Sequence, residues 1–277
     1  MGMKSHTLAL SLETADLGVR LLFHEGSLYQ SLRRRYADYH SSPKASAVCE
    51  VEVDDGPLQG HDPAEPVEIV LRGGRWLMRQ GDALELEYDP AARRGRIRRN
   101  RNGIESDWFL LLFDSALRFL YSLLLLPAGG FLMHAASAVW RERALIFAGA
   151  SGAGKTTISR LAPPDAIVLD DEISCLRPVN HLWTAYTTPF GGALGVRSSR
   201  KGSPVAGLYL LAHGEQTRLT PLGPASGVQG LLRNVVLFPG DPSVVRAVLN
   251  AVCDLVREIP VYRLEFRPEP SVWEMLL

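Results

Sequence analysis

The sequence predicts a mixed α/β (α+β) protein in two parts, a β-rich N-terminal module over residues 1–105 and an α/β domain over residues 106–277. Three observations support this division. Short alternating runs separated by Gly, Asp and Pro turns fill the first hundred residues, which is typical of hairpins. A long apolar helix candidate follows at residues 108–126. Beyond it, apolar strand candidates and helix candidates surround a glycine-rich loop at residues 149–154, which is typical of an α/β sheet.

In the N-terminal module, alternation of apolar and polar side chains predicts strands at residues 7–12 and 17–23. Leu28, Leu32, Tyr36 and Tyr39 are spaced by three and four residues, which predicts a helix. After a Ser-Ser-Pro break, a series of hairpins is predicted from strands at residues 47–53, 67–71, 76–78, 84–88 and 94–98.

The last of these strands carries a concentration of positive charge. Six arginines fall within nine residues: Arg93, Arg94, Arg96, Arg98, Arg99 and Arg101. We expect them on one edge of a hairpin, and two interpretations are open. The arginines could dock an acidic peptide or protein, or they could protect a solvated edge strand from pairing with another sheet.

Residues 108–126 are nearly long and apolar enough for a membrane span. Asp114 and Arg118 argue against insertion, because a charge in the middle of the bilayer costs about 2.5–3.5 kcal/mol on insertion scales. On a soluble helix, two opposite charges four residues apart can pair. We therefore expect a buried helix that joins the two parts of the protein, and no membrane partner.

Composition limits the partners and the location. The 30 basic and 30 acidic side chains balance, so the sequence indicates no broad nucleic-acid surface. Cys49, Cys175 and Cys253 lie far apart, which is typical of reduced, buried thiols rather than of a disulfide or zinc framework. Because the first residues lack the apolar core of a signal peptide, a cytoplasmic location is expected.

After the helix candidate, the second part continues with a predicted strand at residues 131–140, which a tight turn joins to an apolar strand at 144–148. That strand leads into the sequence Gly149-Ala-Ser-Gly-Ala-Gly-Lys-Thr156, the GxxxxGK[ST] pattern of a P-loop. A helix-compatible run extends to residue 161. The later predicted elements are a strand at 166–174, a short run at 183–186, a turn at 188–195, a strand at 205–211, helices at 227–236 and 242–257, and a strand at 261–266.

The glycine-rich pattern predicts a phosphate site. Glycines can adopt backbone angles that a side chain forbids, so successive N–H groups can turn inward around phosphate oxygens. Lys155 adds a positive charge for the β and γ phosphates, the Thr156 hydroxyl can hold Mg²⁺, and a helix beginning near Gly154 adds unpaired N–H groups. The pattern favours a nucleoside triphosphate, with these binding residues: Gly149, Ala150, Ser151, Gly152, Ala153, Gly154, Lys155, Thr156 and Thr157.

Three carboxylates, Asp170, Asp171 and Glu172, end the predicted strand at residues 166–174. Asp170 follows Lys155 by only 15 residues, a spacing typical of kinases. Adjacent side chains at a strand end face opposite ways, so the three are not expected to share one role. One carboxylate should act as base on an acceptor hydroxyl and another should hold Mg²⁺. The alternative is a structural role as helix caps or a solvated strand end.

The order of His134, the loop ending at Lys155 and Thr156, and the Leu169-Asp-Asp-Glu172 run resembles the HPr kinase/phosphorylase family and its kinase-like relatives associated with peptide-modification gene clusters. The resemblance covers residues 130–180 well, and the 189–192 and 259–264 segments more loosely. It implies a P-loop kinase domain similar in fold to the nucleotide domain of phosphoenolpyruvate carboxykinase. It also implies ATP and Mg²⁺ as cofactors, a Ser/Thr hydroxyl of a peptide or small protein as acceptor, and a homo-oligomer.

Carried over by position, the resemblance places His134 beside the phosphates, where it would orient the reacting groups. A histidine satisfied inside a sheet is the alternative. The acidic pair of the family falls either on Asp170 and Asp171 or on Asp171 and Glu172, so Asp171 is the predicted base. Asp170, His134 and Lys155 are the other catalytic candidates. The candidate metal ligands are Thr156, Asp171 and Glu172.

The chain departs from the family pattern at one position. Relatives often carry a metal-directed Glu just after the PFxG-like turn, where this chain has Gly192 and Ala193. Either Glu172 substitutes for it, or metal binding and turnover are weaker, or the chain is a nucleotide-dependent regulator. Nearby, a basic loop could touch the acceptor or simply be solvated; its residues are Arg197, Arg200 and Lys201.

Three functions are compatible with this pattern. The first is an ATP- and Mg²⁺-dependent Ser/Thr kinase that acts on a peptide or small protein, with the N-terminal module recognising the acceptor or mediating assembly. The second is a nucleotide-dependent switch or ATPase with a protein partner. The third is a small-molecule kinase, which shares the short spacing between the P-loop and the aspartates.

Overall fold

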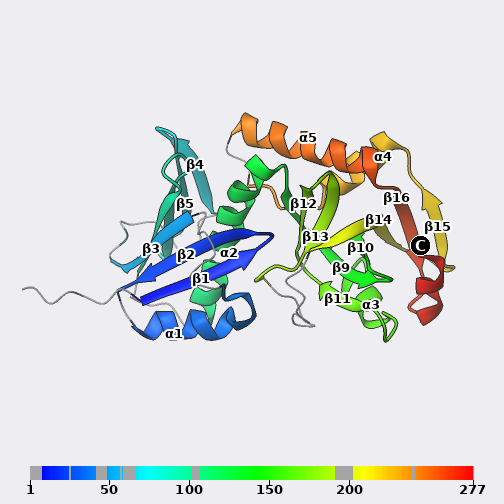
Figure 1. Cartoon of the computed structure of the whole chain (residues 1–277), viewed down its shortest axis with the longest axis horizontal. Helices are drawn as coiled ribbons and strands as arrows, with labels where there is room; N and C mark the ends of the chain where they lie inside the picture. The colour runs from blue at the N-terminus through cyan, green and yellow to red at the C-terminus, as the bar shows by residue number, and fades with distance from the viewer. Residues whose placement is uncertain are drawn as a thin grey trace, which may run out of the picture. The chain divides into compact units, whose positions relative to one another are not determined.

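The computed structural model describes residues 8–24, 26–41, 49–56, 58, 67–100, 106–190, 202–238 and 241–276, and it shows a mixed α/β protein with two β-sheets (Figure 1). Contacts divide the chain into two compact units. Unit 1 comprises Met1–Tyr121 and Phe238–Pro242, and unit 2 comprises Ser122–Leu237 and Ser243–Leu277. This division falls inside helix α2 (Ser106–Leu125), whereas the predicted boundary precedes that helix.

Unit 1 is built on a seven-stranded sheet in the order β1-β2-β3-β7-β6-β5-β4. Its strands are β1 (Leu8–Thr14), β2 (Leu17–Phe23), β3 (Cys49–Asp55), β4 (Glu68–Arg72), β5 (Arg75–Gln80), β6 (Leu84–Asp89) and β7 (Arg94–Arg99). The hairpin prediction is confirmed for β1–β2 and for the meander from β4 to β7, which are antiparallel. Strand β3 instead pairs in parallel with both β2 and β7, a pairing that hairpins do not produce.

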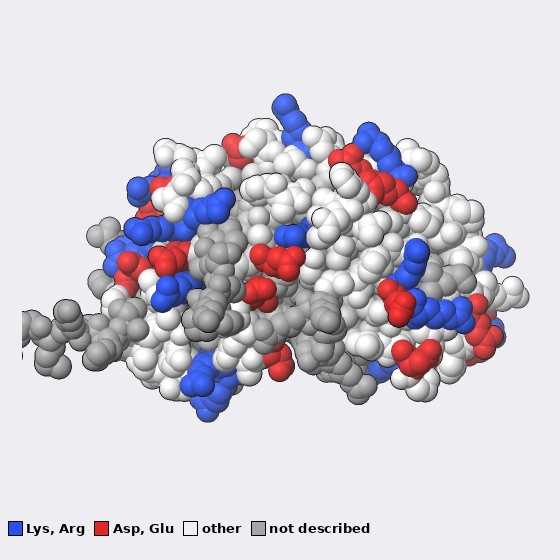
Figure 2. Space-filling model, viewed as in Figure 1, with Lys and Arg blue, Asp and Glu red and all other residues white. Residues whose placement is uncertain are grey.

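The arginine-rich strand β7 is a central strand, so its predicted place at an edge is wrong. It lies between β3 and β6, which both carry acidic side chains. Arg96 pairs with Asp54 on β3, and Arg98 pairs with Glu85 on β6. The positive charge is therefore largely neutralised inside the sheet, and Figure 2 shows basic and acidic side chains interspersed on the visible face of unit 1. Arg101 lies outside the described residues.

Helix α1 (Gly26–Arg35), the 3-10 turn η1 (Ala37–Tyr39) and helix α2 complete unit 1. The carboxylate of Asp114 on α2 is only 3% exposed. It accepts hydrogen bonds from Arg35 Nε at 3.0 Å and from the Tyr36 hydroxyl at 2.5 Å. The charge inside this apolar helix is thus compensated by residues at the end of α1.

In the described part of the chain, one helical stretch, Trp108–Ala128, is long and apolar enough to cross a membrane, with a mean hydropathy of 1.9. It comprises most of α2 and the 3-10 turn η2 (Leu126–Ala128) that follows it. However, 56% of its most apolar window is buried inside the protein, and Phe113, Leu117 and Leu120 are fully buried. The helix is therefore part of the core, in agreement with the expectation from Asp114. The cytoplasmic location stays a prediction.

The three cysteines are free thiols, and the predicted burial is confirmed for two of them. Cys49 and Cys175 are buried, and Cys253 is half-buried. Burial raises the pKa of the Cys49 thiol to about 12, which keeps it protonated and unreactive at neutral pH.

Unit 2 contains a nine-stranded mixed sheet. Its main path is β11-β9-β10-β14-β13-β12-β8, and β16 pairs with β14 and β15. The strands are β8 (Phe131–Met133), β9 (Ala135–Trp140), β10 (Arg143–Ala148), β11 (Ile167–Asp170), β12 (Ser174–Val179), β13 (Leu182–Tyr186), β14 (Ser203–His213), β15 (Arg218–Pro221) and β16 (Val261–Phe266). The predicted hairpin before the glycine-rich loop is confirmed, because β9 and β10 pair antiparallel.

Two predicted strands are each interrupted in unit 2. The predicted strand at 131–140 is β8 and β9, broken at His134, because β8 pairs with β12 whereas β9 pairs with β10 and β11. The predicted strand at 166–174 is β11 followed by a turn, and β12 begins only at Ser174. Both breaks arise where the chain changes its pairing partners, and both carry predicted site residues.

Helices cover both faces of the unit 2 sheet (Figure 1). Helices α4 (Pro224–Leu232) and α5 (Pro242–Glu258) contribute Leu231, Val252 and Leu255 to the core on one face. Helix α3 (Lys155–Arg160) and the 3-10 turn η3 (Pro270–Met275) pack on the other face. The indole N–H of Trp273 donates to the carbonyl of Ile158 at 3.1 Å, so η3 holds α3 in place.

Candidate functional site

Strand β10 delivers the glycine-rich loop, residues 149–154, at its carboxyl end. The strand is fully buried from Ala144 to Ala148 and pairs with β9 on one side and with β14, in parallel, on the other. The loop then turns at Gly152, with a φ of 80°, and at Gly154, with a φ of 104°. Helix α3 begins at the next residue, Lys155, as predicted. A loop between a buried strand and a helix is the context that the P-loop pattern requires.

Two of the glycines leave no room for a side chain. A Cβ added at Gly154 would lie 2.9 Å from the ring of Phe266, and the positive φ there also disfavours any other residue. A Cβ added at Gly149 would lie 2.8 Å from the Cβ of Ala153. The closely folded shape of the loop therefore depends on glycine at both positions.

Lys155 lies against the loop that precedes it. Its Nζ donates to the carbonyl oxygens of Gly149 at 2.8 Å and Ala150 at 3.2 Å. Ser151 and Gly152, at the tip, are exposed. The ammonium group is thus beside a loop whose backbone is accessible to a ligand, while Thr157 lies in the first turn of α3.

The next residue, Thr156, contacts the acidic turn. Its Oγ1 lies 3.3 Å from Oδ2 of Asp171, a side chain that is only 3% exposed. The structure therefore brings the end of the glycine-rich loop and one of the three predicted carboxylates together, although β11 is separated from β10 by β9.

This hydroxyl–carboxylate pair fits Mg²⁺. Among the described residues, no group of three His, Cys, Asp or Glu side chains could hold a metal ion. The pair of Thr156 and Asp171 does not suit zinc, which takes three or four protein ligands. Mg²⁺ binds through one or two carboxylates together with phosphate oxygens and water, so Thr156 and Asp171 are sufficient protein ligands.

Asp170 has a different environment from Asp171. It is 1% exposed, and its Oδ1 accepts the backbone N–H groups of Glu172 at 2.9 Å and Ile173 at 3.1 Å. Its Oδ2 lies 3.1 Å from the hydroxyl of Thr188. Burial raises the pKa of Asp170 to about 7, and the three hydrogen bonds only partly oppose this effect. The carboxylate therefore stabilises the turn after β11 through hydrogen bonds to the backbone of that turn.

His134 lies at the break between β8 and β9. Its Nδ1 is 3.8 Å from Oε1 of Glu172, and both side chains are 46% exposed. Its backbone N–H donates to the carbonyl of Asn234 at 2.7 Å, which fixes the strand break. The alternative of a histidine satisfied inside the sheet is wrong, because the side chain is exposed next to the acidic turn.

The comparison with protein families gives a match over most of the chain. The family model described as SynChlorMet cassette protein ScmC matches residues 101–276. The chain belongs to the ScmC family. The matched residues include the glycine-rich loop and the acidic turn, and the description names a cassette but no activity. A search of curated proteins gives no match.

Some predicted site residues of this ScmC family member lie outside the described residues. They are Gly192 and Ala193 after the PFxG-like turn, and Arg197, Arg200 and Lys201 of the basic loop. Conversely, sequence reasoning missed two residues that contact the site, Thr188 and Asn234. A Thr-Thr-Pro run after a strand is a weak signal for the first, and nothing in the sequence marks the second.

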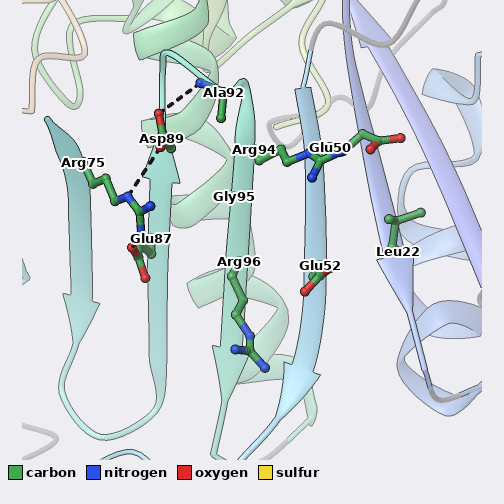
Figure 3. A pocket seen from close by; sticks show the side chains of 10 residues that line it. All are labelled: Leu22, Glu50, Glu52, Arg75, Glu87, Asp89, Ala92, Arg94, Gly95 and Arg96. Carbon is green, nitrogen blue, oxygen red and sulfur yellow. Dashed lines mark hydrogen bonds and ion pairs between the residues drawn. The ribbon is translucent and has the colours of Figure 1, made fainter.

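A separate hollow of about 380 Å³ lies on unit 1, before the segment that the ScmC model matches (Figure 3). Its charged side chains come from β3, β5, β6 and β7. Arg75 pairs with Glu87 at 3.0 Å and with Asp89 at 3.4 Å, and Asp89 also accepts the N–H of Ala92. Glu50 is paired with Arg20 across β2 and β3. Paired charges of both signs line this hollow, so it points to no single ligand class.

Proposed function

We propose that this ScmC family member is an ATP- and Mg²⁺-dependent kinase that transfers the γ-phosphate of ATP to a Ser or Thr hydroxyl of a peptide or small protein. The contact between Thr156 and Asp171 carries the proposal. It joins a GKT loop end to a buried carboxylate, and phosphoryl transfer needs both a phosphate cradle and an acidic group beside it.

In this proposal the backbone N–H groups of residues 149–154 and the ammonium of Lys155 bind the β and γ phosphates. Thr156 and Asp171 would hold Mg²⁺, with Glu172 as a further candidate. When bound, the metal neutralises charge on the β and γ phosphate oxygens. The loop glycines support this role because Gly152 and Gly154 have positive φ angles and a Cβ at Gly149 or Gly154 would clash with the surrounding protein, so the tight turn of the loop depends on them.

The transfer step needs a base for the acceptor hydroxyl. We assign this role to Oδ1 of Asp171, because Oδ2 faces Thr156 and the proposed metal position, so the two oxygens of one carboxylate would serve the two roles that the sequence pattern divides between two residues. This oxygen takes the hydroxyl proton while the acceptor oxygen forms a bond to the γ phosphorus. The bond from that phosphorus to the bridging oxygen breaks, and ADP leaves. His134 and Glu172 lie 3.8 Å apart and are both 46% exposed, and in this proposal they would orient the reacting groups.

The acceptor class rests on the resemblance to the HPr kinase/phosphorylase family. Members of that family phosphorylate a serine of a protein or peptide. The family description of this chain adds support, because a cassette protein has partners encoded with it. On these two points we propose a product of the same gene cassette as the acceptor.

Incubation with ATP labelled at the γ-phosphate, Mg²⁺, peptides encoded beside the gene, and a panel of metabolites tests the proposal. Label on a peptide Ser or Thr, and its absence with Asp171→Asn, is the expected result. Release of free phosphate alone would favour a nucleotide-dependent switch, and label on a metabolite would favour a small-molecule kinase. Either outcome overturns the peptide-kinase assignment.

A further inference from the structure

The turn after β11 carries the two proposed active carboxylates at its centre. Asp171 and Glu172 are flanked by Asp170, which ends β11, and Ile173, which precedes β12. Asp171 faces Thr156 and Glu172 faces His134. The position of both carboxylates therefore depends on what fixes the two ends of this turn.

A threonine hydroxyl joins both ends. Thr188 is fully buried, and its Oγ1 lies 3.1 Å from Oδ2 of Asp170 and 3.0 Å from the carbonyl oxygen of Ile173. The same oxygen is 3.4 Å from the backbone N–H of Phe190, which donates to it. The hydroxyl thus contacts the residue before the active pair, the residue after it, and the segment that follows β13.

Asp170 completes the connection from inside the turn, since its Oδ1 accepts the N–H groups of Glu172 and Ile173. The hydrogen bonds of this cluster are buried, apart from the part-buried one from Glu172, and loss of one partner in a buried bond leaves a polar group without compensation. The cluster contains no group that faces the glycine-rich loop. It can act on the site through the backbone of residues 171 and 172 and through the charge interaction between the neighbouring Asp170 and Asp171 carboxylates.

We propose that Thr188 is a positioning residue for the metal-binding carboxylate Asp171, acting through the turn of residues 170–173. The inference rests on the proposed nucleotide and Mg²⁺ site but not on the identity of the acceptor. Removal of the hydroxyl should let the turn shift and should reduce the enhancement of ATP affinity by Mg²⁺. Groups that orient metal ligands without touching the metal typically change metal affinity or activity by about 10- to 100-fold.

The test measures how much Mg²⁺ enhances ATP affinity, by calorimetry with and without Mg²⁺. Thr188→Val removes the hydroxyl at nearly constant volume, Thr188→Ala removes it by a second route, and Thr188→Ser retains it. Thr184→Val is the matched control, because Thr184 is also buried but its hydroxyl donates to Leu182 within β13. Circular dichroism selects the variants that fold.

We expect Thr188→Val and Thr188→Ala to lose about tenfold of the Mg²⁺ enhancement. Metal-free ATP affinity should stay unchanged, and Thr188→Ser and Thr184→Val should behave as wild type. An undiminished enhancement in a folded Thr188→Val or Thr188→Ala protein would overturn the inference, as would an equal loss in Thr184→Val. Because this readout needs no acceptor, failure of peptide phosphorylation in the wild type would contradict the proposed function while leaving this result valid.

Discussion

Asp170 and Asp171 are adjacent in the sequence, yet their carboxylates have opposite surroundings. The side chain of Asp170 points into the protein and binds the backbone of the turn, whereas that of Asp171 contacts Thr156 at the end of the glycine-rich loop. Side chains at a strand end alternate between the two sides, which accounts for the difference. The same chemical group therefore holds the turn at one position and lies beside the end of the glycine-rich loop at the next.

Sequence reasoning reached the loop and Asp171 because their spacing and residue types are tied to one chemistry. The choice of Asp171 over Asp170 as base rests on the resemblance to the HPr kinase/phosphorylase family, because the residue pattern alone is compatible with either. Sequence reasoning missed Thr188, because a single hydroxyl that reaches back across a strand pair leaves no periodic or compositional signal. The break at His134 was hidden as well, because the run around it is apolar on both sides.

The carboxylates of the acidic turn give the first prediction at this scale. In the presence of Mg²⁺, Asp171→Asn should bind ATP more weakly than the wild type, but the loss of affinity should not exceed the gain that Mg²⁺ gives the wild type. Its rate of phosphoryl transfer should fall by at least about 100-fold, as expected for loss of a general base. Glu172→Gln is the matched control and should retain more activity. If Glu172→Gln were the more damaging change in the transfer assay, the base would be Glu172.

Asp170 gives a pH-dependent prediction for the protein without nucleotide or metal. Burial raises its pKa to about 7, against about 3.9 in an unfolded chain. Between these values the folded state retains a proton that the unfolded state has lost. The contribution of Asp170 to stability therefore falls as the pH rises from about 4 to about 7, and it is constant at higher pH.

Asp170→Asn keeps the acceptor for the two N–H groups and supplies a permanent donor toward Thr188, so it should not show this pH dependence. We expect the wild type to lose a few kcal/mol of unfolding free energy relative to this variant between pH 5 and pH 8. Denaturant unfolding of both proteins at the two pH values measures the difference. A stability difference that is the same at both values would contradict the protonated, buried state of Asp170.

At the scale of secondary-structure elements, helix α2 has the length and apolar composition of a membrane span but is part of the protein core. Its apolar side chains are buried, and Asp114 is held by Arg35 and Tyr36 at the end of α1. Sequence analysis could infer from Asp114 that the helix is not a membrane span. It could not identify the partners, because they lie about 80 residues earlier and meet α2 only through the tertiary fold.

The same contact predicts a stability effect. Asp114→Ala leaves Arg35 and the buried Tyr36 hydroxyl without their acceptor. We expect a loss of about 3 kcal/mol, the low end of the range for breaking a buried pair, because the Arg35 side chain is 34% exposed. Ser115→Ala, one residue further along the same helix, should cost less than about 0.5 kcal/mol. Denaturant unfolding compares the two variants, and equal stabilities would show that the Asp114 contacts contribute little.

Pairing between strands was predictable only where it is local. The meander from β4 to β7 follows from turn residues at short intervals. The parallel position of β3 between β2 and β7 does not, because it joins strands that are separated by long connections. That single pairing moved the arginine-rich strand from the predicted edge to the middle of the sheet, next to acidic neighbours that neutralise it.

At the scale of the whole molecule, the two units differ in what the comparisons say of them. The ScmC family model begins at residue 101, so it takes in α2 and unit 2 and leaves the sheet of unit 1 unmatched. All residues of the proposed phosphate and metal site lie in unit 2. The predicted mixed α/β architecture with a β-rich first part is confirmed at this level, whereas the roles of unit 1 in acceptor recognition or assembly stay predictions.

The most direct test of the whole account is a calorimetric titration of the full chain with ATP and Mg²⁺, performed on the wild type and on Lys155→Ala. We expect saturable binding of one ATP per chain in the wild type. We expect loss of that binding in the variant, because the ammonium beside the carbonyls of Gly149 and Ala150 is removed from the phosphate cradle. Equal ATP affinity in the two proteins, or no ATP binding by the folded wild type, would contradict it.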